Sequence, residues 1–339
     1  MNPTPAATTA LALFSGGLDS ILACRVVATQ GIAVRAVRFV TPFFGDDLLA
    51  READYRAEML RKYDIDVHLI DVTGPFLELL RRPAHGFGRH FNPCVDCKIF
   101  LLATARRRLA DFNASFLITG EVIGQRPMSQ RRDTLRLIER DSGCSELLVR
   151  PLCARNLPAS APESAGLIDR HRLLAFSGRG RSAQIELATR FGITDFPSPA
   201  GGCILTDPIL AARISHYYQT HVEIRPADIR LLLVGRQFVL PGGGWLVLGR
   251  DQKDNEKILA LRQPDDIVLD CIDRPGPFAI LRYGRDPADL SAAAGLLARY
   301  TKKNPALPRE VQVETTSAEE TTVLACPPIK DAAARAWQR

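Results

Sequence analysis

The sequence lacks long apolar runs, and tryptophan and methionine are scarce. Its 339 residues include 2 Trp and 3 Met, and no stretch approaches the roughly 20 consecutive apolar residues that a membrane-spanning helix requires. The first residues also lack the basic start of a secretory signal and run directly into an apolar segment and a glycine turn. These absences predict a cytoplasmic protein with no membrane partner.

The composition is that of an ordinary globular protein. With 46% hydrophobic residues the chain can form a substantial core, and its length suits two domains better than one. In a reducing compartment we expect the 8 cysteines to be free, catalytic or metal-binding rather than disulfide-bonded. The net charge of +6 favours polyanionic partners.

Apolar runs alternate with helical patterns over the first part of the chain. Strands are predicted at residues 9–14, 33–40, 67–72 and 115–120, and helices after the first glycine turn, at 48–63 and at 94–112. This order predicts an α/β fold with a doubly wound, mainly parallel sheet in a domain of residues 1–151. We expect a linker and an extension of this domain at 152–223, a smaller β-rich α+β domain at 224–302, and a tail at 303–339.

A glycine turn between the first strand and its helix is the first candidate site. Glycines let backbone amides approach a ligand, and a helix N-terminus attracts phosphate. The spacing matches neither a Walker loop nor a dinucleotide fingerprint. Candidate ligand-binding residues in this turn and at other strand ends are Ser15, Gly16, Gly17, Asp19, Ser20, Thr41, Gly120 and Glu121.

Three cysteines form the second candidate site. Cys94 and Cys97 begin a predicted helix, a position that lowers a thiol's pKa, and Cys203 lies in a loop rich in Pro and Gly. Three thiolates with an open fourth position suit an iron–sulfur cluster. The alternative is a redox pair in which one cysteine carries a persulfide and another resolves it. Cys24 and Cys271 are expected in the core.

Several motifs resemble known families. SGGLDS at 15–20 resembles the signature of PP-loop ATP pyrophosphatases. NPCVDCK at 92–98 and PAGGCIL at 199–205 are similar to segments of tRNA 2-thiouridylases. The segment 119–130 resembles the TGExxGQ…SQ segment of 4-thiouridine synthases, and 177–193 is similar to stand-alone thiolases related to them.

The second domain carries a further resemblance. The segment 245–250 (WLVLGR) and the later Arg274 to Pro277, ahead of FAILR, resemble the NFACT-R module, which is associated with RNA. The resemblance implies phosphate contacts from basic residues and base stacking on an aromatic ring. The candidates are Arg236, Arg250, Lys253, Lys257 and Trp245.

Together the resemblances imply an ATP-dependent tRNA sulfurtransferase that adenylates a uridine carbonyl and replaces its oxygen with sulfur. They imply ATP, Mg²⁺, tRNA and a sulfur donor as partners. Cys94, Cys97, Cys203 and Asp19 are then the catalytic candidates, and the three cysteines would ligate a 4Fe-4S cluster, with zinc as the alternative metal. The alternative hypothesis is an ATP-dependent PP-loop ligase or amidotransferase that acts on a small molecule and has a zinc site. Residues 120–130 are where we expect the uridine to be read.

Overall fold

The computed structural model describes the following parts of the chain: residues 8–198, 202–284, 286–302, 305–318 and 320–339. The chain divides into two compact units, residues 1–207 and residues 208–339. Each unit has its own sheet. No helix in the described ranges is long and apolar enough to cross a membrane.

The first unit is built on a parallel sheet of five strands in the order β3-β2-β1-β4-β5. The strands are β1 (Thr9–Leu13), β2 (Ala33–Val40), β3 (Asp66–Asp71), β4 (Phe116–Thr119) and β5 (Leu148–Val149). Leu13 of β1 lies opposite Val37 of β2 and Thr119 of β4. The carboxyl ends of these strands therefore share one edge, where parallel α/β sheets bind their ligands.

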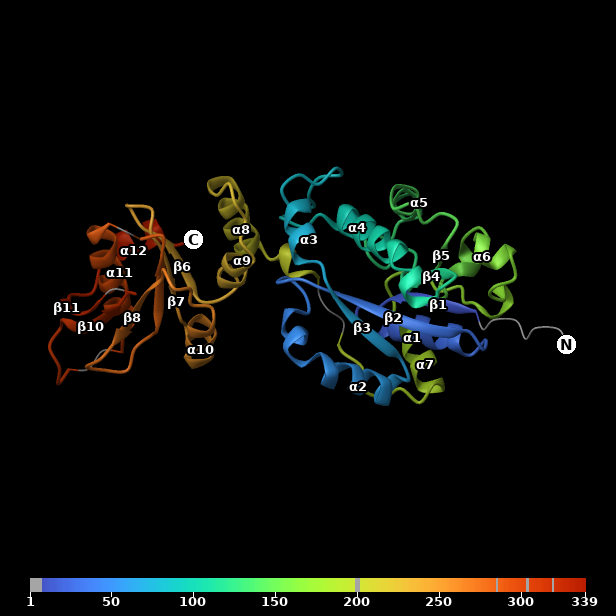
Figure 1. The fold of residues 1–339 in the computed structure, drawn as a ribbon, viewed down its shortest axis with the longest axis horizontal. Helices are drawn as coiled ribbons and strands as arrows, with labels where there is room; N and C mark the ends of the chain where they lie inside the picture. Colours follow the sequence, from blue (N-terminus) through green and yellow to red (C-terminus); the bar gives the residue numbers. More distant parts are fainter. Residues whose placement is uncertain (1–7, 199–201, 285, 303–304, 319) are drawn as a thin grey trace. The chain divides into compact units, whose positions relative to one another are not determined.

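Helices cover both faces of this sheet. They are α1 (Leu18–Ala28), α2 (Glu52–Tyr63), α3 (Thr73–Leu79), α4 (Cys94–Arg107), α5 (Arg132–Asp141), α6 (Ala161–Ser164) and α7 (Ser182–Arg190). Short 3-10 helices are η1 (Asp46–Arg51), η2 (Ala110–Phe112), η3 (Ala154–Asn156), η4 (Arg170–Arg172) and η5 (Ile204–Thr206). In Figure 1, α1, α2 and α7 lie on one face, and α4 and α5 lie on the other.

The sequence of β1 explains why both faces are covered. Ala10 and Ala12 belong to the core cluster that includes α1, whereas Leu11 belongs to the cluster that includes α4. Since successive side chains of a strand point to opposite faces, a continuous apolar strand needs cover on both sides. The predicted doubly wound α/β fold is confirmed.

Two predicted helices have different limits in the structure. The segment predicted as a helix at 48–63 begins with η1, and α2 starts only at Glu52. The helix predicted at 94–112 ends at Arg107 and is followed by η2. The chain then turns at Asn113, which has a left-handed backbone with a φ of 49°. Asparagine tolerates that conformation better than most residues.

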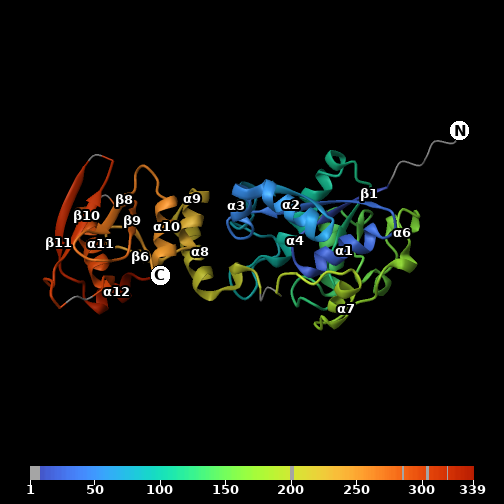
Figure 2. The same ribbon diagram turned by 90° about the horizontal axis from the view of Figure 1, so that it is seen from below.

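The second unit contains an antiparallel sheet of six strands in the order β11-β10-β8-β9-β7-β6. The strands are β6 (Arg236–Val239), β7 (Trp245–Leu248), β8 (Ile267–Cys271), β9 (Ala279–Arg282), β10 (Val311–Thr316) and β11 (Thr321–Cys326). The helices are α8 (Pro208–Thr220), α9 (Pro226–Leu232), α10 (Gln252–Ala260), α11 (Pro287–Tyr300) and α12 (Asp331–Trp337). α11 lies beside β8 and β10 (Figure 2), and its Leu297 shares a core with Leu269 of β8.

The segment at 303–339, which we predicted to be a tail, contains β10, β11 and α12 in its described residues. β10 pairs with both β8 and β11, and Val311, Val313 and Thr315 are buried between more exposed neighbours. That alternation is the pattern of a strand with one buried face, and the sequence analysis overlooked it. The second unit also begins earlier than the predicted residue 224, because α8 belongs to it.

Candidate active site at the glycine loop

The turn between β1 and α1 holds its polar groups in a closed network. The Ser15 and Ser20 hydroxyl oxygens lie 3.3 Å apart, the Gly17 amide donates to Ser15 Oγ at 3.3 Å, and Ser20 Oγ donates to the Gly17 carbonyl at 2.7 Å. α1 begins after Gly17 without a capping side chain. Its first amides and the positive end of the helix dipole are therefore available to an anion.

Arg38 lies against this turn, and the sequence analysis did not single it out. Gly16 has a φ of 78°, and a Cβ at this position would lie 2.3 Å from a guanidinium nitrogen of Arg38. Arg38 is fixed because it donates to the Tyr55 hydroxyl at 2.7 Å. The available signal was the second of two arginines in β2, which lies two residues before the carboxyl end of the strand.

Asp19 meets two side chains from distant parts of the chain. Gln125 Nε2 donates to Asp19 Oδ2 at 2.8 Å, and Arg181 Nη2 lies 3.6 Å from Asp19 Oδ1. Three buried atoms of this group form no hydrogen bond to the described residues: Asp19 Oδ1, Gln125 Oε1 and Arg181 Nε. Buried polar atoms without partners are rare and costly, so this junction has unused capacity for a polar ligand. A carboxylate suits Mg²⁺, and a guanidinium suits phosphate.

The two segments compared with thiouridine synthases and stand-alone thiolases come together beside the loop. Ile123 and Ser177 form a parallel β-bridge, and the Gly178 amide donates to the Ile123 carbonyl at 2.7 Å. Gln125 lies two residues after Ile123 in the chain, and Arg181 lies three residues after Gly178. The bridge therefore explains how both side chains reach Asp19.

Gly120 packs directly on the glycine turn. A Cβ at this position would lie 2.4 Å from the Asp19 carbonyl group and 2.6 Å from the Ser20 amide nitrogen. These atoms belong to the backbone and cannot move aside like the end of a flexible side chain. Gly120 is thus required by the close approach of two backbones.

Glu121 is buried and lies between two cationic side chains, although its Oε1 forms no hydrogen bond to the described residues. Arg150 Nε donates to Glu121 Oε2 at 3.0 Å, Thr119 Oγ1 donates to the same oxygen at 3.1 Å, and Lys98 Nζ lies 3.4 Å from Oε1. Burial by itself would raise the pKa of Glu121, but Lys98 and Arg150 lower it below its ordinary value. Only 2% of this residue is exposed, so its observed contacts are with Thr119, Lys98 and Arg150.

Thr41 follows β2 and is completely buried. Its hydroxyl accepts the Phe43 amide at 3.1 Å, and its backbone exchanges two hydrogen bonds with Phe44. Its observed contacts therefore fix a tight turn at the carboxyl end of β2.

The three candidate cysteines are neighbours. The pKa values of Cys97 and Cys203 are each influenced by Cys94. Asn92 Nδ2 donates to Cys94 Sγ at 3.2 Å. Cys203 is exposed, whereas Cys94 and Cys97 are half-buried. Residues 199–201, which belong to the predicted PAGGC loop, lie outside the described residues.

The predicted low pKa at the start of α4 is wrong for Cys97. Burial of the thiol raises the pKa of Cys97 to about 12, despite the nearby positive charge of Lys98. Desolvation of the sulfur atom also raises the pKa of Cys203, although the residue as a whole is exposed, and the main opposing contribution is a hydrogen bond from the Leu205 backbone. In this arrangement the desolvation of a thiolate therefore has a larger effect on the thiol pKa than a helix N-terminus has.

The cysteines are not arranged as a ready metal site. In the part of the chain that the structure describes, no three His, Cys, Asp or Glu side chains are grouped so that they could hold a metal ion. The geometry thus does not fit a cluster or a zinc ion without movement of the thiols. Cys94, Cys97 and Cys203 as metal ligands stay a prediction.

The structure confirms Cys24 as a core residue. It is 1% exposed, and burial raises its pKa to about 12. Cys271 is half-buried, packs against the core of the second unit and has its sulfur 3.1 Å from Thr301 Oγ1. Cys153 is buried and donates to the Glu121 carbonyl at 3.2 Å.

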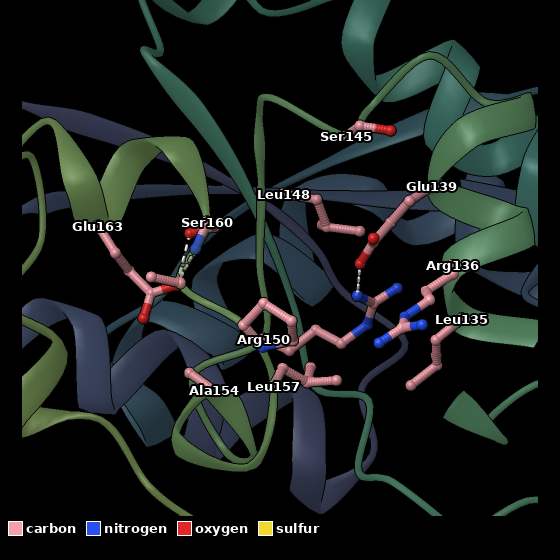
Figure 3. Close-up of a pocket in the computed structure, with 12 residues that line it drawn as sticks. Leu135, Arg136, Glu139, Ser145, Leu148, Arg150, Ala154, Leu157, Ser160 and Glu163 are labelled. Atoms are coloured by element: carbon pink, nitrogen blue, oxygen red, sulfur yellow. Dashed lines mark hydrogen bonds and ion pairs between the residues drawn. The ribbon is translucent and has the colours of Figure 1, made fainter. Parts of the chain in front are cut away.

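A small cavity of about 130 Å³ lies behind the Glu121–Arg150 pair. It is lined by residues of α5, β5 and α6, and Figure 3 shows Arg150 extending toward Glu139 of α5. Arg150 and Glu139 form an ion pair. Arg150 Nε and Nη1 therefore contact carboxylates, and the cavity lies beside this ion-pair cluster.

In the second unit, Trp245 is not the stacking surface that we predicted. Its side chain is only 6% exposed, and its indole nitrogen donates to Gln237 Oε1 at 2.7 Å. β7 is buried along its whole length, so the ring belongs to the core. Among the basic candidates, Arg250 pairs with Asp254, and Arg236 donates to the Gly249 carbonyl.

Lys253 and Lys257 of α10 are exposed. Arg250 is exposed as well but pairs with Asp254, and Arg236 is half-buried. They are one turn apart on the same helix face, since residues four apart on a helix are neighbours. Unlike Arg250, they show no ion pair within the described part of the unit, so they are the preferred candidates for phosphate contacts.

Family models match both parts of the chain. Residues 6–156 match the model described as thiamine biosynthesis protein (ThiI), and residues 235–338 match the NFACT protein RNA binding domain. Both resemblances are confirmed. The second match also includes most of the segment that we expected to be a tail.

Individual relatives cover the chain only in part. A "Probable tRNA sulfurtransferase" from Ureaplasma urealyticum serovar 10 (strain ATCC 33699 / Western) is 29% identical over 147 residues, which are 42% of this chain and 36% of that protein. The chain therefore spans little more than a third of this curated relative.

Two solved structures show a similar arrangement over part of their length. A 4-thiouridine synthetase–RNA complex with bound ATP is 21% identical, with a TM-score of 0.35 over 54% of this chain and 50% of that chain. The U34-tRNA thiolase NcsA from Methanococcus maripaludis with its 4Fe-4S cluster is 14% identical, with a TM-score of 0.34 over 67% and 71%. Neither TM-score reaches 0.5, so the similarity of this chain to known proteins is argued from the family models and the curated relative alone.

Proposed function

We propose that this protein is an ATP-dependent tRNA sulfurtransferase that makes thiouridine. The observation that carries the proposal is the junction of Asp19, Gln125 and Arg181, whose buried unpaired atoms lie at an anion-binding loop. The matched family model and the curated tRNA sulfurtransferase favour sulfur transfer over a ligase that acts on a small molecule.

In the first half-reaction the uridine carbonyl oxygen attacks the α-phosphate of ATP, and pyrophosphate leaves. The amides of the glycine turn, with the Ser15 and Ser20 hydroxyls, hold the departing pyrophosphate. Arg38 and Arg181 supply positive charge close to the turn. Asp19 would hold Mg²⁺ together with the phosphates, and the ion would neutralise phosphate charge. Such preorganised charges stabilise the transition state of phosphoryl transfer.

In the second half-reaction we propose persulfide chemistry. An outside persulfide donor transfers sulfur to Cys203, the exposed thiol of the three. The terminal sulfur attacks the adenylated carbon, and AMP leaves with the former carbonyl oxygen. The Cys94 thiolate then attacks the Cys203 sulfur and releases the thiouridine sulfur, which forms a Cys94–Cys203 disulfide. An external dithiol reductant restores both thiols.

The proposed RNA substrate agrees with the second unit, whose sequence matches an RNA-binding domain. Lys253 and Lys257 would contact the phosphate backbone. The affinity that such contacts provide falls as the salt concentration rises, because each neutralised phosphate releases counterions.

Metal and sulfide content tests the sulfur route. We expect the protein purified without oxygen, and its Cys94→Ala variant, to hold no stoichiometric iron or acid-labile sulfide. The wild type should convert tRNA uridine to thiouridine with ATP and a persulfide donor, and the variant should not. Iron and sulfide that disappear in Cys94→Ala would overturn the persulfide route in favour of a cluster. Wild-type protein that produces no thiouridine in any tRNA would refute the proposed function.

Gly120→Ala tests the ATP site independently of sulfur. The added Cβ must displace the Asp19–Ser20 backbone, and a misplacement of about 1 Å can reduce a rate by about 100-fold. We expect ATP-dependent pyrophosphate release to fall by about that factor. Gly74→Ala is the matched control, because a Cβ there meets nothing within 4 Å. Equal activity of both variants would contradict the role of Gly120.

A further inference from the structure

The connection between α3 and α4 carries a pair of stacked aromatic rings. The rings of Phe87 and Phe91 have centroids 4.4 Å apart and planes inclined by 21°. Phe91 is 9% exposed, whereas Phe87 is 39% exposed. The inner ring therefore supports the outer ring, which presents apolar surface to solvent.

This connection is held in place by side chains around it. Asp96 accepts the Ala84 amide at 3.0 Å and contacts His85 Nδ1 at 3.1 Å, while His85 Nε2 lies 3.2 Å from Asp141. The Gly88 amide donates to the Asn92 carbonyl at 2.9 Å. A ring that is already fixed loses less conformational entropy when a ligand stacks on it.

The same connection adjoins the candidate cysteines. Asn92 Nδ2 lies 3.2 Å from Cys94 Sγ and 3.3 Å from Met128 Sδ. A Cβ on Gly88 would lie 2.4 Å from Asn92 Nδ2 and 2.6 Å from Met128 Sδ. Asn92 therefore joins the aromatic pair to Cys94 and to the segment that contains Gln125.

The charge of this connection suits a nucleic acid. Residues 80–92 contain three Arg and two His and no acidic residue. Arg82 and Arg89 are exposed, and their side chains make no hydrogen bond or ion pair with the described residues. An aromatic surface flanked by free cations is the arrangement that binds a base and its phosphates.

We propose that Phe87 is the surface on which an unpaired uridine of the RNA substrate stacks, beside Cys94. The inference rests on the proposed function and deepens it, since it names a residue that holds the reacting nucleoside. Stacking on Phe87 would hold the base at the connection that Asn92 links to Cys94, and Arg82 and Arg89 would contact the adjoining phosphates.

Variants of Phe87 test this proposal in the full-length protein. We expect Phe87→Ala and Phe87→Leu to lower thiouridine formation by roughly 5- to 150-fold, the range that a lost base-stacking contact gives. Phe87→Tyr and Phe87→Trp should retain activity, because both keep an aromatic face. ATP binding should be unchanged in all four variants. Leu60→Ala, which removes a side chain that is 54% exposed on α2, should behave as the wild type.

A binding measurement separates this proposal from the proposed function. Uridine-containing oligonucleotides should quench the additional fluorescence of Phe87→Trp relative to the wild type, whether or not thiolation occurs. No quenching, or equal activity of Phe87→Leu and Phe87→Trp, would overturn the stacking role. A wild type that forms no thiouridine, combined with a quenched Phe87→Trp, would instead count against sulfur transfer and leave base stacking supported.

Discussion

Arg150→Met is expected to lower the free energy of unfolding of the first unit by about 3–5 kcal/mol, the usual effect of removing one partner of a buried ion pair. Arg150 is 3% exposed and lies between Glu121 and Glu139. Without the guanidinium group, Glu121 retains only Lys98 as a cationic partner. The loss is large because the remaining charge is already removed from water.

Hydrogen exchange of peptides that contain β4 is the suitable measurement. Both tryptophans, Trp245 and Trp337, lie in residues 208–339, so their fluorescence follows the second unit. Arg108→Met is the matched control, because Arg108 pairs with Asp111 at the surface and such a pair contributes at most about 1 kcal/mol. Equal protection of β4 in the two variants would show that the buried pair does not stabilise this unit.

The pH dependence of this effect has a defined sign. In the wild type the pKa of Glu121 is lowered, so its ionised form stabilises the fold above its ordinary pKa of about 4.3. This contribution is lost as the pH falls through the lower folded value. In Arg150→Met, ionised Glu121 opposes folding at neutral pH. The difference in stability should therefore be full near pH 7, shrink as the pH falls toward ~4 because Glu121 of the variant becomes protonated, and shrink further below pH ~4 because the wild-type contribution is lost. A difference that is constant with pH would implicate packing instead of charge.

The glycine turn was predictable because its signals are local. An apolar strand, Gly16 and Gly17, and an uncapped helix start follow one another within a few residues. The same holds for the alternation of apolar runs with helical patterns over the first part of the chain, which predicts the doubly wound sheet. By contrast, Gln125 and Asp19 are 106 residues apart in the chain, and no spacing rule links them.

Two of the wrong predictions, for Trp245 and Cys97, share a physical cause, which is burial by distant segments. Trp245 was predicted to be a stacking surface because it is an aromatic residue at the start of a short strand, yet β7 is covered on both faces. Cys97 occupies a helix start that favours a thiolate, but burial raises the pKa of its thiol. Local patterns identify which residues carry chemistry. Their protonation state and accessibility depend on what the fold packs against them.

Arg181→Met is expected to reduce ATP-dependent pyrophosphate release by about 10²–10³-fold, the effect of losing one preorganised charge or donor in a transition state. Arg181 Nη2 lies 3.6 Å from Asp19, and its buried Nε has no hydrogen-bond partner among the described residues. Phosphates in the glycine turn would give that nitrogen an acceptor. They would also draw the guanidinium group away from the Asp19 carboxylate, which would then be available to Mg²⁺.

The neighbouring Arg179 provides a matched control, because it has the same charge, lies two residues away and is exposed. Arg179→Met should change pyrophosphate release less than threefold, so the comparison cancels any effect of net charge on tRNA binding. Arg181→Lys should restore only part of the rate, since an ammonium group cannot reproduce the planar contacts of a guanidinium. If Arg179→Met and Arg181→Met reduced the rate equally, the segment 177–193 would act through its overall charge, and Arg181 would have no specific role at the phosphates.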